Sequence, residues 1–448
     1  MKNTLHFTMM LLTVALCASF VRAQDPVRPD PSMTNTSAPT YAIRGARVVT
    51  VSGAELDNAT VVISNGLISA VGANVTPPSG AQEIDGRGLT VYPGMIDLGT
   101  NMGLSEVSAV GATNDTTELG DMNPNVATIW SVNPHSNHIN VTRVAGVTSA
   151  LALPSGGIIS GQAALINLAG SSPREMAVAP QAALVVEFPR IGGGGGFAAF
   201  LQAQQGITPD ALAARDRRID QLRQLLRDAE AYGRAQDAYA KDPKNVERPP
   251  SDLKLAALVP YVRGERPVIF RAEREREIRA ALRFAEEMKL KAVIIGGSEA
   301  WKTAQLLKER NVPVILDSVL NMPLREDDPY DSLYENASKL QAAGVRFAIS
   351  TGDSGAHVRD LPFHAGMAAA YGLPKSEALK AVTLYPAQIL GVADRLGSIE
   401  QGKVANLVVT DGDLLEARTS VRHLFIAGRQ IPLVSRHTML SDQFKDRK

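Results

Sequence analysis

The stretch that decides the fold is Val91-Tyr-Pro-Gly-Met-Ile-Asp-Leu-Gly-Thr-Asn-Met-Gly103. An apolar run leaves a Pro-Gly turn and ends in a group of small polar residues. This pattern is typical of a buried parallel strand that brings its C-terminal end to the mouth of an active site. The stretch therefore predicts where a functional site should be sought, around Gly99 and Asn101.

The composition is that of an ordinary globular protein. Of the 448 residues, 45% are hydrophobic and 21% are charged, and Lys+Arg and Asp+Glu both total 46. Because the charges balance, no global basic field exists to attract nucleic acid or an anionic membrane. We therefore expect a small-molecule substrate or ligand as partner and no nucleic acid, and the sequence leaves a homo-oligomer open.

The first 23 residues have the pattern of a secretory signal peptide. Lys2 precedes the apolar run 7–20, and Val21-Arg-Ala23 supplies small residues for cleavage before Gln24. An uncleaved anchor is the alternative, but its core is shorter than the roughly 20 residues that a span requires. Cleavage also removes Cys17, the only cysteine. The sequence thus predicts an exported, periplasmic or extracellular protein without disulfides or a membrane partner. Residues 24–40 are predicted to form a disordered leader before the first domain.

Eight short apolar runs alternate with amphipathic segments, which is the pattern of successive βα units. Eight is also the number of strands that closes a TIM-like barrel. We expect these strands at Gly94–Leu98, Gly146–Leu153, Ala163–Leu168, Ala182–Glu187, Arg266–Phe270, Lys291–Ile295, Pro313–Leu316 and Val345–Ser350.

Two further segments depart from a minimal barrel. Ile191–Phe197 is glycine-rich and is interpreted as a linker, with a mobile lid or backbone anion nest as the alternative. Pro209–Asp242 is long and charged, and predicts a helical insertion outside the barrel or against another subunit.

Three motifs resemble the metal-dependent amidohydrolase superfamily. Pro93–Asp97 resembles its first barrel strand, Pro-Gly-Phe-Ile-Asp-x-His-x-His, and Pro267–Arg274 resembles its fifth, Pro-Val-x-x-His-Ala-x-Arg. Gly397–Val409 resembles the superfamily's Gly-Ser-Ile-Glu-x-Gly-Lys-x-Ala-Asp-Leu-Val-Val. The chain is identified as a member, nearest to exported imidazolonepropionase-like proteins. This implies hydrolysis of a carbon–nitrogen bond other than a peptide bond, in a linear or cyclic amide.

The resemblance also implies an α/β architecture, a TIM-like (β/α)8 barrel with a small β-sandwich built from both chain ends. The implied boundaries are 41–92 and 394–435 for the sandwich, 93–393 for the barrel and 436–448 for a tail.

The superfamily holds one or two divalent, zinc-like metals with His-x-His, a carboxylated Lys or Glu, two further His and an Asp. The resemblance places these ligands at Gly99, Asn101, Asn167 or Glu187, Arg271, Gly296 and Asp353. Only Asp353 matches, with Glu187 as a second carboxylate. Because catalytic zinc sites are rich in histidine, and Arg271 is a permanent cation, no metal is expected in the standard arrangement.

We therefore expect an atypical site. The candidate catalytic residues are Asp353, Arg271, Glu187 and His357, and the candidate substrate-binding residues are Asn101, Glu273 and Asn167. Arg271 and Asp353 are predicted to form a charge-assisted pair across the mouth, which could bind a carboxylate or carbonyl group. The alternative is that the pair merely fills a decayed site.

The remaining metal candidates are weak. His135 and His138 stand at i, i+3 and could join Asp353 or Glu187 as ligands, although a capping loop is the alternative. His357 could act as a general base, or be a loop histidine without function. Two functions stay open at this point: a hydrolase with an atypical site, and a non-catalytic barrel that binds a ligand or partner.

Overall fold

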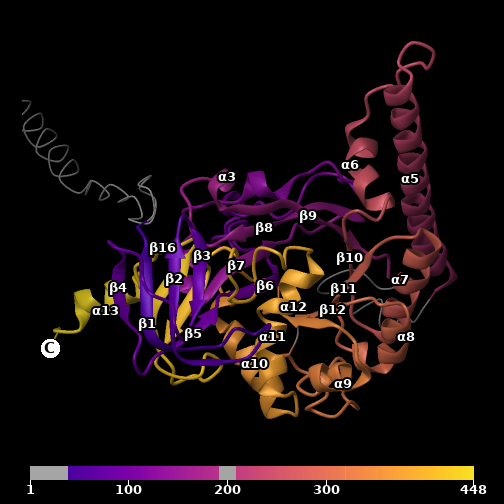
Figure 1. Ribbon diagram of the computed structural model, residues 1–448. Coiled ribbons are helices and arrows are strands. Elements are labelled where there is room, and N and C mark those ends of the chain that lie inside the picture. Colours follow the sequence, from indigo (N-terminus) through magenta and orange to yellow (C-terminus); the bar gives the residue numbers. More distant parts are fainter. Residues whose placement is uncertain (1–38, 191–207, 318, 353, 448) are drawn as a thin grey trace, which may run out of the picture.

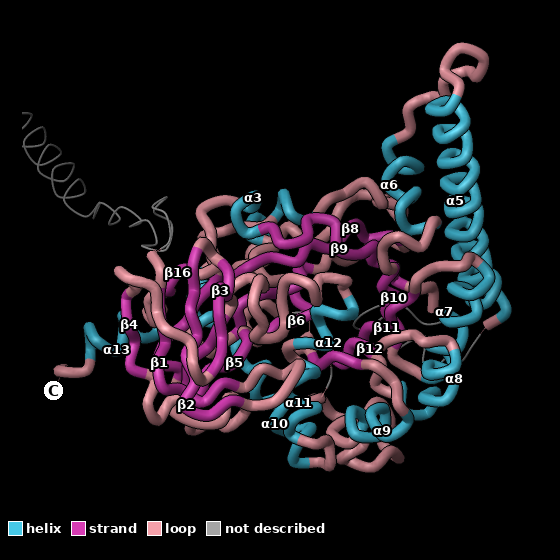
Figure 2. Tube along the Cα trace, in the orientation of Figure 1, coloured by secondary structure: helices cyan, strands magenta, loops and turns pink. Residues whose placement is uncertain are grey.

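The computed structural model describes residues 39–190, 208–317, 319–352 and 354–447. The chain forms two β-sheets (Figures 1 and 2). One closes into a barrel and the other forms a smaller β domain. Most of the helices lie outside the barrel. The predicted signal peptide, almost all of the leader, the glycine-rich segment and Asp353 lie outside the described residues. Within the described ranges, no helix combines the length and the apolar character needed to cross a membrane.

Eight neighbouring strands form the barrel sheet, and all eight predicted strands are present. They are β6 (Met95–Thr100), β7 (Val147–Ala152), β8 (Ile159–Asn167), β9 (Ala177–Glu187), β10 (Val268–Ala272), β11 (Ala292–Gly296), β12 (Val314–Leu316) and β13 (Phe347–Ile349). The predicted TIM-like barrel is therefore confirmed, with one departure from successive βα units. β8 runs antiparallel to β7 and β9, because only the turn 153–158 separates it from β7 and leaves no room for a crossover helix.

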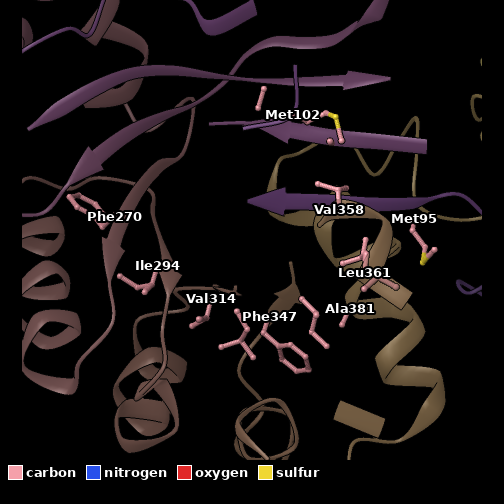
Figure 3. Close-up of a cluster of buried hydrophobic side chains, with 14 of the residues drawn as sticks. Met95, Met102, Phe270, Ile294, Val314, Phe347, Val358, Leu361 and Ala381 are labelled. Atoms are coloured by element: carbon pink, nitrogen blue, oxygen red, sulfur yellow. The ribbon is translucent and has the colours of Figure 1, made fainter. Parts of the chain in front are cut away.

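Side chains alternate between the inside and the outside of the barrel. The interior cluster includes Ile269, Val293 and Ile315. Their chain neighbours Phe270, Ile294 and Val314 belong to a second cluster, on the outer side of the strands (Figure 3). This period of two means that Arg271, two residues after Ile269 in β10, points to the inside.

The helices follow the strands in chain order. They are α2 (Asn137–Arg143), α3 (Pro173–Met176), α5 (Pro209–Lys241), α6 (Leu253–Val262), α7 (Glu275–Glu287), α8 (Ala304–Glu309), α9 (Asn336–Ala343), α10 (Leu361–Ala370), α11 (Lys375–Ala381), α12 (Leu384–Ile389) and α13 (Arg436–Phe444). Short 3₁₀ turns are η2 (Gly111–Thr113), η3 (Thr128–Ser131), η4 (Ala300–Thr303) and η5 (Val358–Asp360).

The predicted helical insertion is α5, which packs along α6 and projects from the barrel (Figure 1). Thr208 caps its N-terminus by accepting a hydrogen bond from the Ala211 amide, with Pro209 in the first turn. Gly233 allows the two helices to approach closely, since a Cβ there would lie 3.2 Å from the Val259 side chain. The insertion therefore lies outside the barrel, as predicted.

Both chain ends build the second sheet. Its strands are β1 (Tyr41–Val48), β2 (Leu56–Ser64), β3 (Leu67–Gly72), β4 (Gln82–Asp85), β5 (Thr90–Pro93), β14 (Leu407–Thr410), β15 (Val421–Ile426) and β16 (Arg429–Gln430). The order is β16-β15-β14-β5-β1-β2-β3, with β4 paired to β1. β5 and β14 join the two ends as antiparallel neighbours, and the chain passes from β5 through Gly94 directly into β6. This confirms the small domain that the resemblance implied.

Candidate functional site

A charged cluster lies at the C-terminal ends of β9, β10 and β12, the end at which barrel enzymes carry their functional groups. Arg271 Nε donates a hydrogen bond to Glu187 Oε1 at 3.0 Å, and Arg271 Nη1 lies 3.9 Å from Asp317 Oδ2. Arg271 and Glu187 are direct partners in the parallel β9–β10 register, so both side chains project from the same face. The three side chains are only 14%, 26% and 10% exposed, so their charges interact in a partly desolvated setting.

Glu273 is the third carboxyl group near Arg271. Its Oε2 accepts hydrogen bonds from Ser298 Oγ at 2.7 Å and from the Ser298 amide at 3.3 Å. Burial raises the pKa of Glu273, while the Ser298 hydrogen bonds and the Arg271 charge oppose that rise. Glu273 is therefore a carboxyl group that holds its proton more strongly than an exposed glutamate.

Two of the superfamily's histidine positions are filled by neighbouring groups. A Cβ built at Gly296 would lie 2.6 Å from Glu273 Cδ, and Gly296 has a φ of +98° that disfavours any side chain. A Cβ at Gly99 would lie 2.7 Å from Ser350 Oγ and 3.0 Å from Ile295 Cδ1. An imidazole at either position would thus require its neighbours to move.

The described residues at this mouth do not fit the superfamily's metal. Three carboxylates, Glu187, Glu273 and Asp317, surround the guanidinium of Arg271, and a divalent ion would have to share them with that cation. Within the described ranges, no group of three or more His, Cys, Asp or Glu side chains could hold a metal. The resemblance to the superfamily implies a divalent metal, but these donors are not those of a histidine-rich zinc site.

Asp97 has a structural role at the end of β6. It is fully buried and accepts hydrogen bonds from Ser350 Oγ at 2.5 Å, Thr351 Oγ1 at 2.6 Å, the Thr351 amide at 3.1 Å and the Gly99 amide at 2.9 Å. Ser350 and Thr351 follow β13, the other end of the strand order. The carboxylate therefore ties the two ends of the barrel sheet together.

Asn101 lies beside this closure. Its Oδ1 accepts a hydrogen bond of 2.7 Å from the Gly355 amide, which links the loop after β6 to the loop after β13. Asn101 thus stays near the predicted mouth, but its described partner is a backbone amide.

The structure removes Asn167 from the candidate site. Because β8 is antiparallel, its C-terminal residue pairs with Ser149, near the start of β7 and at the opposite end of the barrel. Asn167 Oδ1 accepts hydrogen bonds from Ser149 Oγ at 3.0 Å and from Asn406 Nδ2 at 2.8 Å. Asn167 therefore does not lie at the mouth predicted for it, and its described hydrogen bonds join the barrel to the β domain.

The predicted histidines lie in segments that follow β6 and β13 rather than β9, β10 or β12. His135 is exposed, and His138 Nε2 lies 3.1 Å from the Glu106 carbonyl oxygen. His357 is exposed and precedes η5; burial, with a smaller contribution from the charge of His357, lowers the pKa of His364 to about 4. The predicted Arg271–Asp353 pair falls outside the described residues.

Sequence reasoning missed Asp317 and Ser298. Asp317 directly follows the predicted strand Pro313–Leu316, so its place at a strand end was available as a signal. Ser298 had no such signal, because it takes part through its contact with Glu273 from a neighbouring strand end.

Comparisons with known proteins support one family. The model of the amidohydrolase family matches residues 269–431. Amidohydrolase tasK of Hapsidospora irregularis is 26% identical over 397 residues, covering 82% of this chain and 39% of that protein. N-acetylglucosamine-6-phosphate deacetylase of Haemophilus influenzae is 54% identical over 37 residues, which are 8% of this chain and 10% of that protein. The matches thus span well under half the length of both relatives.

Solved structures extend the likeness over the barrel and the β domain. An amidohydrolase from Thermotoga maritima MSB8 superimposes with a TM-score of 0.75 and 27% identity, covering 88% of this chain and 99% of that one. Molinate hydrolase shares the fold, with a TM-score of 0.51 at 17% identity over 89% of this chain and 96% of that one. With its barrel and its two-ended β domain, the chain has the fold of the amidohydrolase from Thermotoga maritima MSB8, and residues 269–431 match the amidohydrolase family model.

Proposed function

We propose that the protein hydrolyses a carbon–nitrogen bond other than a peptide bond, in a linear or cyclic amide, at the charged cluster of Glu187, Arg271, Glu273 and Asp317. The observation that carries the proposal is the placement of a carboxyl group with a raised pKa, Glu273, near the partly buried cation Arg271 at the C-terminal ends of the strands. The resemblance to the superfamily supports the reaction class.

The roles follow from the contacts. Arg271 supplies positive charge where negative charge develops on the carbonyl oxygen, in a setting that excludes most water. The hydrogen bond from Arg271 Nε to Glu187 fixes the plane of the guanidinium. Ionised Glu273 accepts a proton from the water that adds to the carbonyl carbon. It then returns that proton to the nitrogen as the carbon–nitrogen bond breaks.

Glu273 suits this double role because its raised pKa strengthens it as a base and keeps its proton available for donation. Ser298 holds the carboxyl group through Oγ and its amide, which limits the directions that the carboxyl group can take. Asp317 adds a second negative charge on the other side of Arg271. The cluster therefore favours an amide whose nitrogen side is neutral or positively charged.

The test is Glu273→Gln, measured on a panel of acyl anilides, hydantoins and lactams. We expect kcat to fall by about 10²–10⁴-fold, the usual contribution of a general acid–base, with no loss of Tm. Glu275→Gln is the matched control, because Glu275 pairs with Arg279 on the surface of α7. Unchanged kcat in Glu273→Gln would contradict the proposed mechanism, as would a wild-type rate that appears only with added zinc.

A non-catalytic binding protein is the second candidate. It is favoured by Gly99 and Gly296, whose side-chain space is taken by Ser350, Ile295 and Glu273. A wild-type protein that binds amides from the panel without hydrolysing them would support this alternative over the hydrolase.

A further inference from the structure

We propose that a cleft outside the barrel, between α5, α7 and the segment after β9, binds an oxyanion carrying two or more negative charges. The cleft has a volume of about 480 Å³. It is called the arginine cleft here because its lining includes Arg190, Arg215, Arg223, Arg276 and Arg283. The proposal does not rest on the proposed hydrolase function.

Helical spacing brings these guanidinium groups to one place. On α7, Arg276, Ala280 and Arg283 follow at i, i+4 and i+7 and therefore share one face of the helix. On α5, Arg215 and Arg223 are eight residues apart and share the opposing face. Arg190 follows β9 and adds a cation from a third segment.

The carboxylates of the cleft are already engaged. Glu287 Oε1 accepts a hydrogen bond of 2.7 Å from Arg223 Nε and lies 3.3 Å from Arg227 Nη2. Glu277 Oε2 accepts hydrogen bonds from the amides of Glu273 and Arg274, and so caps α7. Both acids that line the cleft thus have partners of their own.

Three cations are left without a described counter-charge. Within the described ranges, the side chains of Arg190, Arg276 and Arg283 make no ion pair or hydrogen bond, and all three residues are exposed. Arg215, in contrast, donates to Asp216. The sequence from 191 to 207, which follows Arg190, contains neither Asp nor Glu. The cleft therefore concentrates positive charge in a chain whose formal net charge is zero.

The floor of the cleft is apolar and well packed. Phe188 contacts Phe284 with ring centroids 5.7 Å apart, and Phe270 lies 5.9 Å behind Phe188. Arg223 covers the Phe284 ring at 5.8 Å. A floor of low polarity strengthens the attraction between the rim and an anion. Guanidinium groups also match the geometry of phosphate and carboxylate oxygens, so a phosphoryl or polycarboxylate ligand is the expected class.

The test is a titration with pyrophosphate and with citrate by calorimetry and thermal unfolding, at an ionic strength held constant with NaCl. We expect at least one oxyanion to bind the wild-type protein with a Kd below about 1 mM and to raise Tm. The double variant Arg276→Gln/Arg283→Gln should weaken binding at least about tenfold and lose the Tm shift. It should fold normally, because neither side chain has a described partner.

Arg217→Gln is the matched control, since Arg217 is an exposed arginine of α5 that does not line the cleft. It should bind like the wild type. Binding of pyrophosphate alone would identify a phosphoryl ligand, and binding of citrate alone a polycarboxylate. The proposal is overturned if neither oxyanion binds the wild-type protein, or if the double variant binds as tightly as the control.

Discussion

Two regions at the same end of the barrel use carboxylates in different ways. One is the contact of Asp97 with Ser350 and Thr351, called the β6–β13 seam. The other is the charged cluster of Glu187, Arg271, Glu273 and Asp317, called the β9–β12 sector. At the seam, Asp97 is fully buried and receives only neutral donors, from Ser350, Thr351 and Gly99. In the sector, carboxylates surround Arg271 and remain partly exposed. The difference indicates that the seam holds the barrel closed, whereas the charged side chains of the sector remain accessible to a ligand or a proton.

The largest expected effect is at the seam. Asp97→Ala leaves the buried hydroxyl groups of Ser350 and Thr351 without their acceptor, and should lower the free energy of unfolding by about 3–5 kcal/mol. Urea denaturation measures it. Asp394→Ala, a change at a side chain that is 74% exposed, is the control and should have almost no effect. A loss below about 1 kcal/mol for Asp97→Ala would end the structural assignment of the seam.

The next effect tests whether Glu273 fills the space at position 296. Gly296→Ala should cost about 2–4 kcal/mol, from the left-handed φ and from the collision with the Glu273 carboxyl group. In a Glu273→Ala background the same change should cost less, because only the backbone term remains. Gly264→Ala isolates that term, since Gly264 has a φ of +70° and nothing within 4 Å of a Cβ. Equal costs in both backgrounds would show that the two positions do not touch.

A third effect concerns the pH dependence of stability in the β9–β12 sector. Because the pKa of Glu273 is raised from its ordinary 4.5, the unfolded chain loses this proton at lower pH than the folded chain does. The stability that the folded protein gains from binding this proton more tightly is therefore complete below about pH 4.5. It is lost as pH rises through the pKa of Glu273 in the folded protein. Glu273→Gln lacks this loss.

The free energy of unfolding of Glu273→Gln should accordingly gain on the wild type as pH rises above 4.5. Ser298→Ala removes a hydrogen bond that lowers the pKa of Glu273, so it should move this window to higher pH. Chemical denaturation at a series of pH values measures both. A difference that is flat or falls with pH would contradict the assigned direction.

The smallest effect concerns Asn101. Asn101→Ala removes one hydrogen bond to the Gly355 amide and should cost about 0.5–1.5 kcal/mol. If hydrolysis is found, this variant should change the rate less than Glu273→Gln does. A larger kinetic effect than that of Glu273→Gln would move the reacting group from the β9–β12 sector towards the seam.

Much of the fold could be predicted from the sequence, because buried strands are local apolar runs and the motif around Pro93 identifies their order. The direction of β8 could not be predicted from the sequence. The short turn 153–158 decides it, and the apolar pattern of a strand is the same in both directions. The resemblance of Gly161–Asn167 to a superfamily segment placed Asn167 at the mouth, whereas the antiparallel β8 takes it to the opposite end of the barrel. Glu187 and Arg271 were found through the superfamily motifs, whereas the Ser298–Glu273 contact depends on packing between strand ends.

The central claim is that a cluster centred on Arg271 stands where the superfamily holds its metal. Metal content by mass spectrometry, after expression with added zinc and dialysis, tests it most directly. We predict less than about 0.1 equivalent of divalent metal per chain, because the donors around Arg271 do not fit zinc. Close to one equivalent, lost in Asp317→Asn or Asp353→Asn, would contradict the claim.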